Sequence, residues 1–121
     1  MGNLYAGQVN TKSDAVLTRG TVPDANTTIE GGERVIWVCT TPTAERTITV
    51  KNYDRTRFDH YMNEGPRKPH IMIKCGVDCS GFEILVKDEA GNTLYTFTED
   101  HSTTAIYIVL RLSTSNTWEL A

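Results

Sequence analysis

The sequence has few of the residues that cross-link small proteins or anchor them in membranes. Its 121 residues include only three cysteines, and an odd number without an export signal favours free thiols in a reducing compartment. No apolar run approaches the roughly 20 residues that a transmembrane helix needs. The first residues, Met1-Gly2-Asn3-Leu4-Tyr5, lack the basic and apolar regions of a signal peptide. We therefore expect a protein that folds in a cytoplasm, without disulfides and without a membrane partner.

Positive charge is also scarce, and it is unevenly distributed. The net charge is −3, which argues against the basic surface that non-specific nucleic-acid binding requires. Residues 51–74 hold six basic and three acidic side chains, a sum of +3. The other 97 residues hold six basic and twelve acidic side chains, a sum of −6. The chain is thus an acidic body with one basic segment, and nucleic acid is not an expected partner.

Helical periodicity is absent beyond two turns, whereas strand-forming residues are abundant. The chain contains eighteen threonines, and β-branched residues favour strands. Residues 34–40 (RVIWVCT) are apolar on both faces, which is typical of a strand in the middle of a sheet or at an interface. Seven segments predict strands, and Ala15-Val16-Leu17 suggests a short eighth. The seven are 34–40, 46–50, 70–75, 82–87, 93–98, 104–112 and 117–120.

Alternation within these segments predicts which side chains form the core. Ile71, Ile73 and Cys75 share one face of their strand. The same reasoning predicts inward positions for two further sets. These are Phe82, Ile84 and Val86, and Ile106, Ile108, Leu110 and Leu112.

Regularly spaced short strands favour a single all-β domain. We expect a β-sandwich or a jelly-roll-like fold of seven to eight short antiparallel strands over residues 34–121. Residues 1–33 are rich in Gly, Thr, Asn and Asp, and they predict an extended N-terminal arm with turns.

No combination of residues predicts catalysis or metal binding. Cys75 and Cys79 have C-x3-C spacing near His70, but zinc needs four ligands and the third cysteine is distant. A disulfide between the two is possible on spacing, although a buried apolar thiol is the simpler interpretation of Cys75. His60 follows Asp59, but adjacent strand residues point to opposite faces and do not orient each other. We therefore expect no enzymatic activity, no cofactor and no bound metal.

The long basic segment 52–69 is the best candidate for a partner-binding surface. It is unusually long for a connection inside a small domain. It also carries arginine and aromatic residues, which are enriched at protein interfaces. The candidate partner-binding residues in it are Arg55, Arg57, Phe58, Tyr61, Arg67 and Lys68.

Two stretches resemble modules of tailed-bacteriophage virions. Residues 20–34 (GTVPDANTTIEGGER) are similar to a pattern in which an LPDAT phrase precedes a glycine and a strand. Residues 100–104 (DHSTT), followed by 117–120 (TWEL), are similar to the DNST…W ending of the same modules. The resemblance implies a β-sandwich that is commonly trimeric, is not an enzyme, and occurs in head-decoration proteins or tail-fibre tips.

Three functional hypotheses follow. The first is a capsid decoration or cement protein, located in the virion and assembled in the host cytoplasm, that binds the major capsid protein or another virion protein as a homotrimer. The alternative is a tail-tip or fibre module that binds a receptor or carbohydrate. It requires Trp37 and Trp118 to be exposed stacking platforms, whereas their positions in strands favour burial of both in the core. The third is a small enzyme that uses His60 or the cysteines. For the first hypothesis, Leu4, Tyr5 and Val9 of the arm join the partner-binding candidates, and Trp37, Tyr107 and Val109 form the expected oligomer seam.

Overall fold

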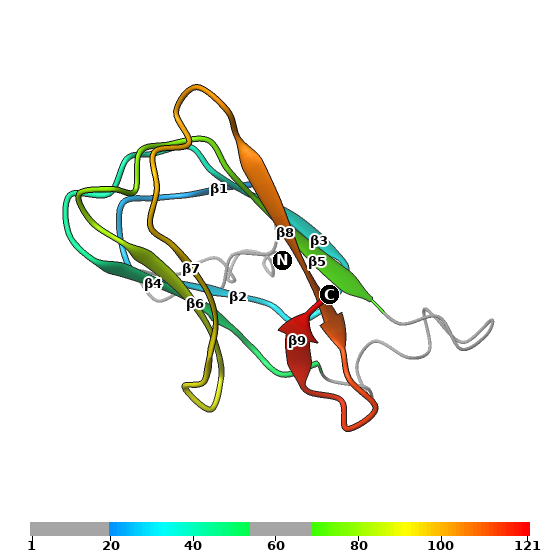
Figure 1. The fold of residues 1–121 in the computed structure, drawn as a ribbon. Coiled ribbons are helices and arrows are strands. Elements are labelled where there is room, and N and C mark those ends of the chain that lie inside the picture. Colours follow the sequence, from blue (N-terminus) through cyan, green and yellow to red (C-terminus); the bar gives the residue numbers. More distant parts are fainter. Residues whose placement is uncertain (1–19, 54–68) are drawn as a thin grey trace, which may run out of the picture.

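The computed structural model describes residues 20–53 and 69–121, and over these ranges the chain forms nine β-strands and no helix. The strands form two sheets that enclose one apolar core, which confirms the all-β class (Figure 1). The five-stranded sheet, in the order β1-β3-β5-β8-β9, contains β1 (Gly20–Val22), β3 (Arg34–Val38), β5 (His70–Cys75), β8 (Ile106–Leu112) and β9 (Trp118–Leu120). The four-stranded sheet, in the order β2-β4-β6-β7, contains β2 (Thr27–Ile29), β4 (Arg46–Val50), β6 (Ile84–Asp88) and β7 (Thr93–Phe97).

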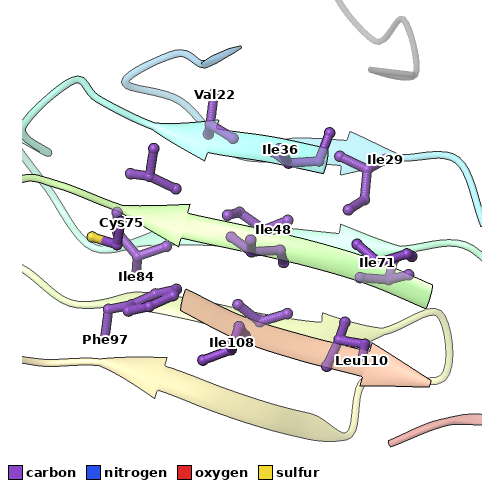
Figure 2. Close-up of a cluster of buried hydrophobic side chains, with 14 of the residues drawn as sticks. Val22, Ile29, Ile36, Ile48, Ile71, Cys75, Ile84, Phe97, Ile108 and Leu110 are labelled. Carbon is purple, nitrogen blue, oxygen red and sulfur yellow. The ribbon is translucent and has the colours of Figure 1, made fainter. Parts of the chain in front are cut away.

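The alternation predicted from the sequence determines which side chains enter the core. On β5, Ile71, Ile73 and Cys75 are completely buried, whereas Met72 and Lys74 between them are only half-buried. The inward set of β8 is confirmed in the same way, with Ile106 only partly buried at its start. Figure 2 shows the labelled inward side chains of both sheets, among them Ile71 of β5, Ile108 of β8 and Ile48 of β4, gathered in the core between the sheets.

The strand directions differ from the predicted arrangement. From β1 to β6 the chain passes to the other sheet at every connection (Figure 1). When the chain re-enters a sheet, the new strand runs in the same direction as the previous strand of that sheet. The pairs β1-β3, β3-β5, β2-β4 and β4-β6 are therefore parallel. Among the strands in the described residues, β5-β8, β6-β7 and β8-β9 are the antiparallel pairs. The prediction of antiparallel strands was wrong for four of these seven pairs, because the connections between the sheets take the place of hairpins.

The segment 20–33, which the sequence analysis assigned to the arm, contributes two strands to the sheets. β1 pairs with β3 and β2 pairs with β4, each over three residues. Strands of this length are too short to show alternation, so only the turns between them were predictable. Asp24, in the β1–β2 connection, accepts hydrogen bonds from Arg46 Nε at 2.8 Å, Thr43 N at 3.1 Å and Thr43 Oγ1 at 2.7 Å. This carboxylate therefore ties the first connection to the one between β3 and β4.

The two sheets are also joined by a hydrogen bond from an aromatic side chain. Trp118 on β9 is 3% exposed, and its Nε1 donates a hydrogen bond to the carbonyl oxygen of Lys51, just after β4, at 2.9 Å. Burial of an indole with its N–H paired is the usual arrangement for a core tryptophan. The environment of Trp118 is therefore that of the core.

The residue at the start of the predicted strand 82–87 is not in the core. The strand begins at Ile84, two residues later than predicted, and Phe82 is 48% exposed in the β5–β6 connection. Because Phe82 precedes the first paired residue, the alternation of β6 does not extend to it. The predicted inward position of Phe82 was therefore wrong, whereas those of Ile84 and Val86 are confirmed.

Candidate protein-binding face

The outer face of the five-stranded sheet exposes large apolar side chains. Ile36 and Val38 of β3 point into the core, so Val35 and Trp37 point outward, where they are 52% and 46% exposed. On β8, Tyr107 is 57% exposed for the same reason. Strand 34–40 was predicted to lie in the middle of a sheet or at an interface. The mid-sheet position is confirmed, since β3 lies between β1 and β5, but the expected burial of both faces is not found in the described residues. The second apolar face of β3 stays about half exposed in the part of the chain that the structure describes.

Strand register brings these side chains into a row across the sheet. Trp37 lies opposite Lys74 on β5, and Lys74 lies opposite Tyr107 on β8. The Lys74 Nζ is 4.2 Å from the centroid of the Trp37 ring and 5.7 Å from that of Tyr107. Both distances are within the range of cation–π attraction. We call Trp37, Lys74 and Tyr107 the aromatic–lysine row.

A second row lies beside the first and is wholly apolar. In it Val35 faces Met72, and Met72 faces Val109. The expected seam residues Trp37, Tyr107 and Val109 therefore lie on one face, although they come from strands far apart in sequence.

The third row marks the polar border of this face. Arg111 on β8 lies opposite Glu119 on β9, and its Nε donates to Glu119 Oε2 at 3.0 Å. Both side chains are about half exposed, so this ion pair contributes little stability. The charges of Arg111 and Glu119 neutralise each other. Lys74, at the centre of the apolar part of the face, has no such partner in the described residues. An apolar centre with a polar rim is the common composition of a protein interface.

The other candidate partner-binding residues lie outside the described residues, so their places on the molecule are not assigned. They are Leu4, Tyr5 and Val9 of the arm, and Arg55, Arg57, Phe58, Tyr61, Arg67 and Lys68 of the basic segment.

The two close cysteines form a buried contact rather than an exposed reactive site. Cys75 and Cys79 are both completely buried, and their Sγ atoms lie 3.7 Å apart. Removal from water, the largest cause, and the neighbouring Cys75 raise the pKa of Cys79 to about 12. Such a thiol stays protonated near neutral pH and is a poor nucleophile. The structure thus confirms the interpretation of Cys75 as a buried thiol, whereas Cys39 is exposed.

His101 and Trp118 are buried and are not part of the exposed face. His60 lies outside the described residues, and His101 is buried with its ring edge-on to Phe97. Within residues 20–53 and 69–121, no three His, Cys, Asp or Glu side chains are grouped so as to hold a metal ion. Strand position favoured core burial for both tryptophans, and this prediction is confirmed for Trp118, which is 3% exposed, but is wrong for Trp37, which is 46% exposed.

Sequence reasoning missed the lysine at the centre of the face. Lys74 occupies an outward position of β5, which the alternation of Ile71, Ile73 and Cys75 does indicate. What the sequence does not contain is the pairing of β5 with both β3 and β8, and that pairing sets Lys74 between two rings.

Comparison with protein-family models, curated proteins and solved structures found no match for this chain. Over the parts of the chain described here, no helix has the length and apolar character needed to cross a membrane.

Proposed function

We propose that this chain is a non-enzymatic bacteriophage structural protein, a capsid decoration protein that binds between capsid subunits and stabilises the head. In this proposal the fold is a β-sandwich, the copies associate as a homotrimer, and the shell partner is the major capsid protein or another virion protein. The assembled virion is its location.

One observation carries the proposal, namely the outward exposure of Val35, Trp37 and Tyr107 on a single sheet face. Contiguous exposed apolar surface of this kind marks interaction sites on small proteins. Aromatic residues anchored on a rigid support are also the residues that dominate binding energy at interfaces. Beneath this face, Ile36, Ile73 and Ile108 are buried, so the face is backed by the core.

The resemblance of residues 20–34 and of the C-terminal stretch to virion modules supports the capsid assignment. A decoration protein needs no catalytic step, because it acts by binding the assembled state of the shell better than the dissociated state. Such binding stabilises the shell by mass action. The acidic body, with its one basic segment, supports contacts with a charged neighbour at that shell.

The test is co-sedimentation with capsids of the phage that encodes the chain, followed by heating of the loaded shells. The wild-type protein should sediment with the capsids and raise the temperature at which they break open. Trp37→Ser combined with Tyr107→Ser should reduce both effects, because it disrupts the seam of the homotrimer that binds the shell in this proposal. Leu85→Ser, which removes a half-buried apolar side chain from β6 of the other sheet, is the matched control and should retain them. Failure of the wild-type protein to bind such capsids would refute the decoration role.

A second candidate function, a tail-tip module that binds a receptor or carbohydrate, is favoured by one observation. Trp37 and Tyr107 are exposed aromatic rings on one face, and sugars stack on such rings. Against this function, the ammonium group of Lys74 already lies over the ring of Trp37, where a sugar would stack. Binding to a cell-surface glycan, with loss in Trp37→Ser and no capsid binding, would support this function in place of decoration.

A further inference from the structure

The outer face of the five-stranded sheet carries a positive charge in apolar surroundings, and a partner that covers it has to supply the opposite charge. Lys74 is half-buried between the rings of Trp37 and Tyr107, and it makes no salt bridge with any residue that the structure describes. Covering an unpaired charge with an apolar partner is costly. The occupant of this face must therefore bring a carboxylate together with apolar surface.

The same chain presents a surface of that composition. The β5–β6 connection carries Asp78, Phe82 and Glu83, and the β7–β8 connection carries Glu99 and Asp100. A backbone bridge between Asp78 and Asp100, and a hydrogen bond of 2.9 Å from Cys79 N to Glu99 O, hold the two connections side by side. We call these five residues the acidic end.

The acidic end pairs an exposed ring with uncompensated carboxylates. Phe82 is 48% exposed, and the fold gives it no place in the core. Glu83 and Glu99 are exposed, and their side chains make no ion pair within the described part of the chain. Asp78 and Asp100 each accept hydrogen bonds from a serine two residues later, which fixes their carboxylates at the turns. Residues 75–86 and 98–110 contain no lysine or arginine.

We propose that the aromatic–lysine row of one copy of this chain binds the acidic end of a second copy, with Phe82 against the rings and Glu83 or Glu99 against Lys74. This deepens the proposed function, because it names the surface that closes the homo-oligomer seam.

Charge favours a second copy in this arrangement over one in which two identical faces meet. If two aromatic–lysine rows stacked on each other, the two Lys74 ammonium groups would be brought together, and like charges in contact are unfavourable. Contact between row and acidic end instead pairs opposite charges and buries aromatic surface on both sides. The described residues hold six basic and eleven acidic side chains, so a copy of the chain supplies carboxylates in excess.

The test is a charge exchange, measured as solution mass by light scattering over a range of protein concentrations. The wild-type protein should form an oligomer, and Lys74→Glu alone should weaken its association by at least about tenfold. The pair Glu83→Lys and Glu99→Lys should do the same. The three substitutions combined in one chain should restore the oligomer, because the charges are again opposite. Lys87→Glu, which reverses a lysine on the other sheet, is the matched control and should leave the mass unchanged.

A variant that changes no charge tests the same contact in a second way. Phe82→Ser removes an exposed ring without touching the core, so it should fold and should also weaken the association. The proposal is overturned by a wild-type protein that stays monomeric at all concentrations. It is equally overturned if folded Lys74→Glu or Phe82→Ser associates like the wild type, or if the combined variant folds but stays dissociated. Capsid co-sedimentation separates the two proposals: a monomer that still binds capsids refutes only the seam, and an oligomer that ignores capsids refutes only the decoration role.

Discussion

The two tryptophans show how strand position gives one residue type two different roles. Trp37 is outward on a central strand and 46% exposed, whereas Trp118 is 3% exposed and donates to the Lys51 carbonyl. Nothing in the sequence around either residue distinguishes an exposed indole from a buried one, since both lie in strand-forming segments. Trp118 therefore contributes to stability, and Trp37 is available for binding.

Replacement of the two tryptophans should separate these roles. Trp118→Phe loses the hydrogen bond and leaves the Lys51 carbonyl oxygen unpaired, so the free energy of unfolding should fall by about 1–3 kcal/mol. Trp37→Phe keeps an exposed ring and should change the free energy of unfolding by less than about 0.5 kcal/mol. Urea denaturation of both variants measures the difference. Equal stability of the two variants would contradict the environments described for these residues.

Asp24 gives the molecule a pH dependence of stability in the acid range. The hydrogen bond from Arg46, followed by those from Thr43, lowers the pKa of Asp24 from 3.8 to about 2. Because the folded-state pKa is lower than the unfolded one, the carboxylate contributes stability that is fully present above about pH 3.8 and is lost as the pH falls through about 2.

The substitution Asp24→Asn should remove this contribution. The variant should be less stable than the wild type at neutral pH, and the two urea midpoints should converge as the pH is lowered from about 4 to about 2. Glu45→Gln removes an exposed carboxylate from the same β3–β4 connection and is the control, for which no such convergence is expected. If the difference in urea midpoint between Asp24→Asn and the wild type stayed constant down to pH 2, the stabilisation by Asp24 would not depend on its charge.

At the scale of the strand, the sequence predicted most elements and most of the core. The bounds of 46–50 and 70–75 agree with β4 and β5 because alternating β-branched and polar residues define both ends. Phe82 was assigned inward because it fits the period of Ile84 and Val86, although Ser80-Gly81 before it belongs to a turn. Strand pairing was not predictable, since alternation shows which face is buried and says nothing about the neighbouring strand. That is why Trp37, Tyr107 and Val109 were identified but Lys74 was not.

The close approach of two connections gives a test at this same scale. Gly31, between β2 and β3, lies against the backbone after β4, and an added Cβ would collide with the carbonyl oxygens of Lys51 and Asn52. Gly31→Ala should therefore lower the free energy of unfolding by about 1–3 kcal/mol. Gly81→Ala, where a Cβ meets nothing within 4 Å, should be neutral or slightly stabilising. Thermal unfolding that ranked the two variants in the reverse order would contradict this packing.

At the scale of the whole molecule, the chain winds back and forth between two sheets before it closes with antiparallel strands. This course sets β3, β5 and β8 side by side at the centre of one sheet, so three separate segments build one face. The resemblance to virion modules predicted a two-sheet β-protein but not these parallel pairs, which depend on how each connection crosses the molecule. The function proposed for the face depends on that arrangement, since the row does not exist in any single strand.

The most direct measurement of the central claim is hydroxyl-radical footprinting of the assembled protein, with modification read at single residues by mass spectrometry. Trp37 and Tyr107 are about half exposed in a single copy, so both should be modified readily in dilute protein. On oligomer or capsid assembly, both should become protected, whereas Leu85 on the other sheet should not change. Trp37 and Tyr107 that stay as reactive in the assembly as in the dilute protein would contradict the assignment of this face as the contact surface.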